Sequence, residues 1–474
     1  MKRRTFLTYS MAVPFSGGLI TLAACGGSSG GGTDISDNIT GVQTSLNIPP
    51  LLEMDENNAI LLTAQTGQTS FIDSVSQATW GYNGAYLGPT IRVRKDDTVN
   101  FTVTNNNIGE DITTHWHGLH IPGEVDGTPY QRIANGDSWA PTLEIAQEAS
   151  TNWYHSHIHG RTSEHVYKGM AGMFIIEDTN SDALDLPKTY GEDDIPLIVQ
   201  DKLFNDDGTM ELPSGGRFLG NTILVNGTVN PVLEVQRKKV RFRLLNGSNA
   251  RFYQFRMSDN GSFIKIATEG GFLNEPVTMN SLIMGPGERN EIVIDFSGYD
   301  IGDEITLISD DLDNGTGNTF DIIQFIVVEA TLPDSTLPLI MNTVPSPDDF
   351  TTVTNHSFDL GGGAIGIDGA GRQSFDMMRN DLTVTKGEYQ KWTISGGHHT
   401  FHVHGCSFLI LTRGGVAPSA ADAGWKDTVI VENNEDVEFV VRFNYSANAL
   451  SRYMFHCHIL GHEDNGMMGQ FEVI

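Results

Sequence analysis

The stretch Phe455-His456-Cys457-His458-Ile459-Leu460-Gly461-His462, followed by Met467, decides how this chain is to be understood. One cysteine stands between two histidines, and a further histidine and a methionine come within the next ten residues. Two imidazoles, one thiolate and a weak axial methionine form the ligand set of a blue-copper site that passes single electrons. His399 lies upstream, beside another histidine pair, and is the candidate for the second imidazole. The stretch therefore predicts a blue-copper site near the C-terminus.

Histidines also occur as pairs separated by one residue. The pairs are His115 and His117, His155 and His157, His402 and His404, and His456 and His458. On a strand, residues i and i+2 point to the same face about 7 Å apart, so each pair presents two imidazoles to one side. A single pair can be a chance feature of a surface strand. Four pairs, two from each end of the chain, instead predict a cluster of about three metal ions held between two domains.

The two predicted sites share one short peptide. Cys457 belongs to the blue-copper site, whereas its neighbours His456 and His458 belong to the cluster. The covalent link makes a short path for single electrons from one copper to the others. Four electrons are needed to reduce dioxygen to water, and one copper plus three can store them.

The body of the chain has the pattern of β-sandwiches. Segments such as 98–103 and 240–244 alternate apolar and polar residues, and turn signals such as Asn226-Gly227 separate them. With 474 residues the chain is long enough for about three domains. Polar or proline-rich stretches predict boundaries, which give domains at 45–178, 195–330 and 350–474. No histidine lies in the middle domain, so we expect it to provide no metal ligand and to act as a spacer.

The chain resembles the multicopper oxidase family, which includes laccases, bilirubin oxidase and the bacterial cuprous oxidases. The stretches that carry the resemblance are 115–118, 399–405 and 456–467. The resemblance implies an all-β fold of three consecutive cupredoxin-like Greek-key sandwiches and four copper ions. It implies that the type 1 copper is held by His399, Cys457, His462 and Met467; the type 2 copper by His115 and His402; one type 3 copper by His117, His155 and His458; and the other by His157, His404 and His456.

Two carboxylates match acidic positions of the family. The resemblance implies that Asp126 and Glu463 feed protons to the oxygen-reducing cluster, which is chemically sensible because water formation consumes protons. The alternative is that they orient the ligands by hydrogen bonds. Among the remaining residues, we expect His159 to be a non-ligand and Cys406 to be a free, buried thiol. His120, His165 and His356 are expected on the surface or in the core, and His398 at the substrate edge or in a solvated loop.

The first residues are an address signal. Residues 1–25 resemble a twin-arginine export signal that ends in a lipobox-like Leu22-Ala23-Ala24-Cys25, and 26–44 is a glycine- and serine-rich tether. We expect an exported protein, periplasmic or anchored outside the cytoplasmic membrane through a lipidated Cys25. Ordinary cleavage to a soluble product is the alternative. A formal charge of -30 excludes nucleic acid as a partner and otherwise favours solubility.

The prediction of the electron donor rests on a difference between this sequence and the bacterial cuprous oxidases. Where the cuprous oxidases carry a methionine-rich cover, residues 355–375 are short, rich in glycine and free of methionine, and Met377 and Met378 are expected to pack in a core. An uncovered type 1 edge favours a laccase-like activity on phenols or aromatic amines with dioxygen as acceptor. Cuprous oxidation in copper tolerance is the second hypothesis. A copper store and a copper-free scaffold for cell division are the hypotheses outside enzymes, and the complete ligand set argues against the latter.

Overall fold

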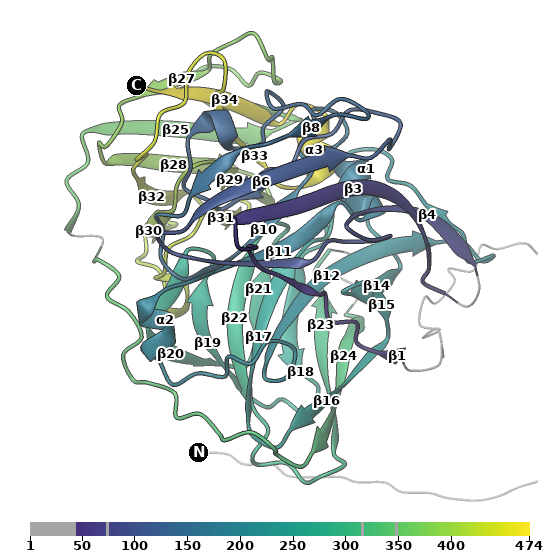
Figure 1. The fold of residues 1–474 in the computed structure, drawn as a ribbon. Coiled ribbons are helices and arrows are strands. Elements are labelled where there is room, and N and C mark those ends of the chain that lie inside the picture. Colours follow the sequence, from purple (N-terminus) through teal and green to yellow (C-terminus); the bar gives the residue numbers. More distant parts are fainter. Residues whose placement is uncertain (1–43, 73–74, 314–316, 347–348) are drawn as a thin grey trace, which may run out of the picture. The chain divides into compact units, whose positions relative to one another are not determined.

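The computed structural model describes residues 44–72, 75–313, 317–346 and 349–474 (Figure 1). The predicted export signal, Cys25 and all but the last residue of the predicted tether lie outside the described residues. Within them no helix is long and apolar enough to cross a membrane.

The first sandwich shows why alternating segments become half-buried strands. In β6 (Thr98–Asn105) the side chains alternate between exposed and buried along the strand, as the sequence predicts. One sheet runs in the order β2 (Leu51–Leu52), β5 (Thr90–Arg94), β11 (Ala171–Glu177), β10 (Ser150–His155) and β7 (His115–His117). The facing sheet contains β4 (Ser76–Tyr82), β3 (Ala59–Ser70), β6, β8 (Ser138–Trp139) and β9 (Thr142–Glu144).

The second sandwich is the teal and green part of Figure 1. Its six-stranded sheet has the order β1 (Thr44–Ser45), β16 (Pro231–Gln236), β24 (Thr319–Val328), β23 (Glu304–Asp311), β18 (Tyr253–Met257) and β21 (Leu282–Met284). Its other sheet has the order β15 (Thr228–Val229), β14 (Thr222–Val225), β12 (Asp194–Phe204), β17 (Lys239–Asn246), β22 (Arg289–Asp295), β19 (Phe263–Thr268) and β20 (Gly271–Met279), with β13 (Met210–Glu211) on β12. Strand β1 precedes the first sandwich in sequence but pairs with β16, so this end of the chain is fastened to the second.

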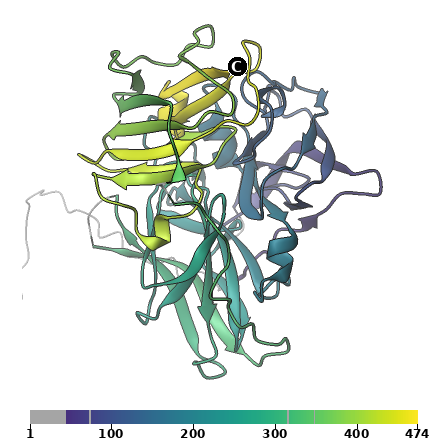
Figure 2. The same cartoon turned by 90° about the vertical axis from the view of Figure 1, so that its left-hand side faces the viewer.

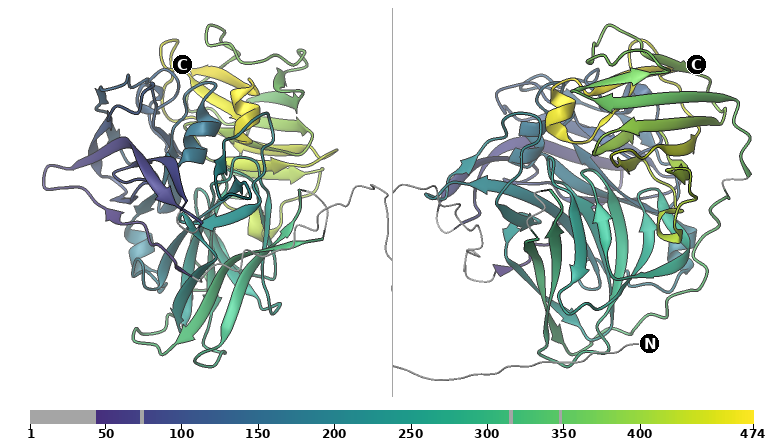
Figure 3. Two further views of the ribbon diagram at one scale, coloured as in Figure 1. Left: turned by 90° about the vertical axis from the view of Figure 1, so that its right-hand side faces the viewer. Right: turned by 180° about the vertical axis from the view of Figure 1, so that it is seen from behind.

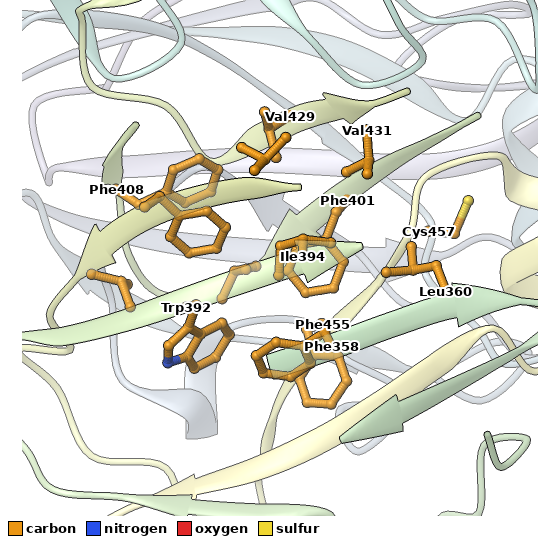
Figure 4. Close-up of a cluster of buried hydrophobic side chains, with 14 of the residues drawn as sticks. Phe358, Leu360, Trp392, Ile394, Phe401, Phe408, Val429, Val431, Phe455 and Cys457 are labelled. Carbon is orange, nitrogen blue, oxygen red and sulfur yellow. The ribbon is translucent and has the colours of Figure 1, made fainter. Parts of the chain in front are cut away.

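The third sandwich carries the predicted blue-copper stretch. Its sheets have the orders β26 (Ala364–Ile367), β25 (Thr354–Gly361), β28 (Gln390–Gly396), β32 (Val437–Val441), β30 (Phe408–Arg413), and β27 (Leu382–Val384), β34 (Met468–Val473), β33 (Tyr453–Cys457), β29 (His399–Val403), β31 (Thr428–Val431). Aromatic and β-branched side chains fill the space between them, and Cys457 lies at one end of this core beside Leu360 (Figure 4). The core thus keeps the Cys457 side chain buried and out of contact with solvent.

Helices are few and short in the described part of the chain. They are α1 (Thr162–Lys168), α2 (Thr179–Ala183), α3 (Leu460–Asp464) and the 3₁₀ turns η1 (Gly123–Val125) and η3 (Ala420–Asp422). The carboxylate of Asp464 on α3 accepts hydrogen bonds of 2.9 Å from the backbone N–H groups of Thr162 and Ser163 on α1. Figures 2 and 3 show the yellow C-terminal strands beside the blue strands of the first sandwich. The chain therefore consists of three consecutive cupredoxin-like Greek-key sandwiches, which confirms the predicted fold class.

Candidate metal centre

Strand register brings the histidine pairs together. On adjacent antiparallel strands His115 lies opposite His155, and His402 lies opposite His456. Residues opposite each other on such strands point to the same face, so each sandwich presents its histidines as a patch. The two patches meet in one cluster, which we call the eight-histidine cluster: His115, His117, His155, His157, His402, His404, His456 and His458. All of these side chains are buried.

One part of the cluster joins the first and third sandwiches around His456. The Nε2 atom of His456 lies 3.2 Å from Nε2 of His157 and 3.3 Å from Nε2 of His404. The ligand atoms of these three residues lie within 4.8 Å of one another, close enough for one ion to bind all three. This is one of the type 3 sets that the resemblance implies.

The second part of the cluster lies around His117 and His155. The Nδ1 atom of His117 is 3.4 Å from Nε2 of His155, and the ring of His458 is 5.0 Å and 5.6 Å from those two rings. The rings of His115 and His402 lie 5.9 Å apart, and their ligand atoms lie close together with one from His404. The structure thus brings together the residues predicted for the other type 3 copper and for the type 2 copper.

Asp126 lies behind the cluster and fixes the orientation of two rings. The Nδ1–H of His404 donates to its carboxylate at 2.7 Å, and the Nδ1–H of His115 donates to its backbone carbonyl at 2.9 Å. Both rings therefore turn Nε2 toward the cluster. The carboxylate is fully buried, and burial raises the pKa of Asp126 well above its ordinary value.

Glu463 has the corresponding place behind the other half of the cluster. Its carboxylate oxygens lie 3.1 Å from Nδ1 of His456 and 3.5 Å from Nδ1 of His157. Burial acts to raise the pKa of Glu463, but the two facing imidazoles outweigh it and hold the pKa below the ordinary value. Glu463 is the residue after His462 on α3, so one short helix carries both.

Asp427 is a third buried carboxylate behind the cluster, and nothing in its local sequence predicts this role. The Nε2–H of His117 donates to Oδ1 of Asp427 at 3.1 Å, and the Nδ1–H of His402 donates to its carbonyl at 2.9 Å. Arg289 of the middle sandwich donates to Oδ1 of Asp427 at 2.7 Å. Burial acts to raise the pKa of Asp427, but Arg289 and His117 hold it well below the ordinary value. Only the tertiary fold joins Arg289 to Asp427, so no local sequence signal could have found this pair.

Several ring nitrogen atoms that face the inside of the cluster have no hydrogen-bond partner and are free to bind metal ions. Nε2 of His115, Nε2 of His402 and both ring nitrogens of His458 are buried without a hydrogen-bond partner. A buried polar atom left without a partner costs about 1–3 kcal/mol, so such atoms are rare unless they serve a ligand. Burial lowers the pKa of these imidazoles below the ordinary value, which keeps them neutral and able to bind a cation. The donor set therefore fits metal binding.

The second predicted site assembles at the end of the third core. The Sγ atom of Cys457 lies 3.5 Å from Nδ1 of His399 and 3.7 Å from Nδ1 of His462. Met467 is buried next to them, and its carbonyl accepts a 3.1 Å hydrogen bond from the backbone N–H of Cys457. Burial raises the pKa of the Cys457 thiol to about 12, so a cation is needed to stabilise the thiolate at neutral pH. We call these four residues the type 1 set.

The other histidines lie outside both sets. The ring of His159 packs on Phe375 at 5.0 Å, as expected for a non-ligand. His165 is buried in the first sandwich and bonds the Ser156 hydroxyl at 2.8 Å, and His120 is partly buried and bonds Ser407 at 2.9 Å. His356 bonds Asp368, and His398 bonds Glu432 while its ring lies 4.0 Å from that of Phe252.

Two side chains test the expectations about burial. Cys406 is a free, buried thiol, as predicted. The prediction that Met378 packs in a core is wrong: it lies in a turn after β26 and is 87% exposed, because the segment from 374 to 381 forms no strand.

The middle sandwich is more than a spacer. It donates no histidine, but Arg289 binds Asp427, and a methyl group added to Gly287 would lie 2.8 Å from the ring of His458. At the type 1 set, a methyl group on Gly216 would lie 3.0 Å from Cδ2 of His462. Backbone of the middle sandwich thus lies against His462 of the type 1 set.

Comparison with known families agrees with this geometry. Three family models, each described as multicopper oxidase, match residues 63–181, 150–303 and 341–474. This chain belongs to the multicopper oxidase family. Membership implies copper as the metal, in agreement with the thiolate and imidazole donors.

Solved structures of this family resemble the chain over most of its length. A laccase-like multicopper oxidase named CueO from Ochrobactrum sp. matches with a TM-score of 0.84 and 36% identity, covering 90% of this chain and 100% of that one. The multicopper oxidase McoA from Aquifex aeolicus matches with a TM-score of 0.82 and 34% identity, covering 91% and 99%.

Curated relatives correct the predicted function. Cell division protein FtsP of Dickeya dadantii is 36% identical, covering 93% of this chain and 94% of that protein, and the FtsP of Escherichia coli is 36% identical, covering 94% and 95%. The prediction of a laccase-like oxidation of phenols or aromatic amines is therefore wrong. The complete set of copper ligands argues against a copper-free scaffold, but it shows only what the chain can bind and does not decide its biological role.

Proposed function

We propose that this chain binds copper at both ligand sets and is an oxidoreductase with dioxygen as its electron acceptor. The position of Cys457 carries the proposal. Its thiol faces the imidazoles of the type 1 set, whereas the flanking His456 lies against His157 and His404, and His458 against His117 and His155. A store for copper needs ligands but no such link, so the bonded path between the two sets favours electron transfer.

The proposed copper sites follow the family resemblance, and the proximity of the ligand atoms supports them. His399, Cys457, His462 and Met467 would hold a type 1 ion, His115 and His402 a type 2 ion, and two sets of three histidines a pair of type 3 ions: His117, His155 and His458, and His157, His404 and His456. Bound copper supplies one-electron transfer and, at the cluster, reduction of dioxygen to water. Burial keeps the imidazoles of His115, His402 and His458 neutral. Hydrogen bonds to Asp126 and Asp427 hold ligand rings in place, and the carboxylate of Glu463 lies 3.1 Å from Nδ1 of His456.

Asp126 and Glu463 are proposed to deliver protons as well. Each touches two cluster histidines from the side away from the metal positions, so each can pass a proton without leaving its place. Their contacts with the rings equally support a role in orienting ligands. With full copper loading, Asp126→Asn and Glu463→Gln should slow oxygen consumption if they deliver protons, and unchanged turnover would leave only the orienting role.

Copper reconstitution tests the main proposal. The purified chain should take up about four copper ions and show the intense visible absorption of a copper–thiolate bond. It should then consume oxygen when ferrocyanide is supplied as a simple electron donor. Cys457→Ser should abolish the visible band and oxygen consumption. Cys406→Ser, which alters a buried thiol outside both sets, is the matched control and should change neither. A chain that binds no copper under these conditions would refute the proposal.

The second candidate function is a task in cell division. It is favoured by the FtsP relatives, which align over more than nine-tenths of this chain. A bacterium that lacks this protein should then divide abnormally, which microscopy of cell length detects. Complementation by the wild-type chain and by Cys457→Ser separates the two candidates: restoration by both means that division needs the folded body alone, and restoration by the wild type only means that it needs the copper chemistry.

We also propose that the protein acts in the periplasm, held to a membrane through a lipidated Cys25. The support is the sequence of residues 1–25 alone. Cys25→Ala should release the protein into the soluble periplasmic fraction, and a variant that stays with membranes would contradict the tether.

A further inference from the structure

A loop of the middle sandwich reaches the type 1 set. Between β12 and β14 the chain makes an excursion over residues 205–221. At its tip, a methyl group on Gly216 would lie 3.0 Å from Cδ2 and 3.4 Å from Nε2 of His462. A methyl group on Gly461 would in turn lie 2.2 Å from the carbonyl oxygen of Gly216. Only glycine allows backbone to pack this closely, so residues 215–216 lie directly on the segment that carries His462.

The residue after this glycine pair anchors the loop. The guanidinium of Arg217 forms an ion pair with Oδ1 of Asp313, and its Cζ atom lies 5.4 Å from the ring centroid of Phe252. The backbone N–H of Phe252 donates to Oδ2 of Asp313 at 3.2 Å, and the Phe252 ring lies 4.0 Å from the ring of His398, the neighbour of His399. The Arg217 side chain is 33% exposed and that of Asp313 is buried. Arg217 is therefore fixed beside the type 1 set by a buried partner.

The charge of Arg217 lies beside the type 1 ligands. Arg217 directly follows Gly216, whose backbone lies against the His462 ring, and its guanidinium lies on the Phe252 ring that packs against His398. Other charges nearby are largely paired: Arg251 lies 3.0 Å from Asp201 and 3.9 Å from Asp313, and Arg372 bonds Asp359. Glu432 is held by His398 at 2.8 Å. Arg217 and Asp313 form the ion pair beside the type 1 set, and each partner can be replaced without replacing the other.

We propose that Arg217 is a positioning residue of the type 1 site, which holds the glycine loop on His462 and raises the reduction potential of the copper bound there. The inference rests on the proposed function. A fixed positive charge destabilises the doubly charged copper ion more than the singly charged one, and a partly buried site screens this effect less than water does. Asp313 partly offsets that charge. Arg217 and Asp313 should therefore act on the potential in opposite directions.

The experiment is a redox titration of the copper-loaded protein, followed by the visible absorption of the type 1 site. In Arg217→Gln the midpoint potential should fall, and in Asp313→Asn it should rise. Arg217→Lys keeps the charge and should stay near the wild type. The expected change in the redox equilibrium constant is about threefold to tenfold, and tenfold corresponds to about 59 mV for one electron. Arg132→Gln, in an exposed pair with Asp111 outside the type 1 set, should leave the potential unchanged.

The outcomes separate this inference from the proposed function. If loosening the loop were the only effect, Arg217→Gln and Asp313→Asn would shift the potential in the same direction, or not at all, and the inference would be overturned although copper binding and oxygen consumption persist. If Asp313→Asn fails to fold, the contrast between Arg217→Gln and Arg217→Lys decides. A wild-type chain without a type 1 absorption would overturn both proposals.

Discussion

Replacing Asp427 by asparagine tests how the fold prepares the cluster. The carboxylate of Asp427 accepts hydrogen bonds from His117 at 3.1 Å and from Arg289 at 2.7 Å, and all three side chains are buried. Asparagine keeps the shape but removes the negative charge. Arg289 is then a buried cation without a counter-ion, and the neutral amide, with one acceptor oxygen in place of two, holds Arg289 and the His117 ring more weakly.

The structure sets the size of both effects. Removing one partner of a buried ion pair costs about 3–5 kcal/mol, and losing the group that orients a metal-binding histidine costs about 10–100-fold in metal affinity. Asp427→Asn should therefore lower the free energy of unfolding of the copper-free protein by about 3–5 kcal/mol. It should also weaken copper binding at the eight-histidine cluster while leaving the type 1 set loaded, because neither Cys457 nor His462 touches Asp427 in the described hydrogen-bond network.

Denaturant unfolding of the copper-free protein measures the first effect, and copper analysis together with the visible absorption of the type 1 site measures the second. Asp359→Asn is the control, since Asp359 pairs with Arg372 on the surface, where such a pair contributes about 0–1 kcal/mol. A loss of stability no larger than in this control, together with full copper at the cluster, would refute the idea that the buried pair holds the site in shape.

Three further outcomes follow from single contacts. Gly287→Ala should cost copper at the cluster, because its methyl group would lie 2.8 Å from the His458 ring at a residue with φ +85°, and unchanged copper content would contradict this. The copper-free protein should lose stability as the pH falls below about 4, because Arg289 keeps the folded-state pKa of Asp427 below its unfolded value of about 3.9; unfolding curves at pH 7 and pH 3 that coincide would count against it. Met378→Ala should change stability by less than about 0.5 kcal/mol, since the side chain is 87% exposed, and a larger loss in thermal unfolding would show a missed contact.

Local periodicity explains what could be predicted. The two-residue spacing of the histidine pairs is the side-chain period of a strand, so β7 and β29 follow from the sequence with their imidazoles on one face. The Cys457 stretch likewise contains most of its ligand set within ten residues. Strand periodicity alone does not show which histidines bind the same copper ion. That assignment comes from the family resemblance.

Contacts between distant segments explain what could not be predicted. Arg289 and Asp427 are 138 residues apart and are joined only by the packing of two sandwiches. The same holds for Gly216, where glycine is required because the backbone lies close to the His462 ring. Nothing in the sequence of residues 205–221 predicts this contact. The middle sandwich carries no histidine, so its sequence predicts only a spacer. Its contribution is backbone and charge around the ligands.

The arrangement of contacts also bears on how the two candidate functions can coexist. The cluster ligands come from the first and third sandwiches, so bound copper must stabilise their association by linkage. Other contacts between these sandwiches involve no metal ligand: the N–H of Gly123 donates to the carbonyl of Ser446 at 3.1 Å, and Asp464 accepts from Thr162 at 2.9 Å. The body should therefore stay assembled without copper, at lower stability. A surface used in cell division would persist in a copper-free variant, whereas the redox chemistry would not, and this is why ligand substitutions can separate the two functions.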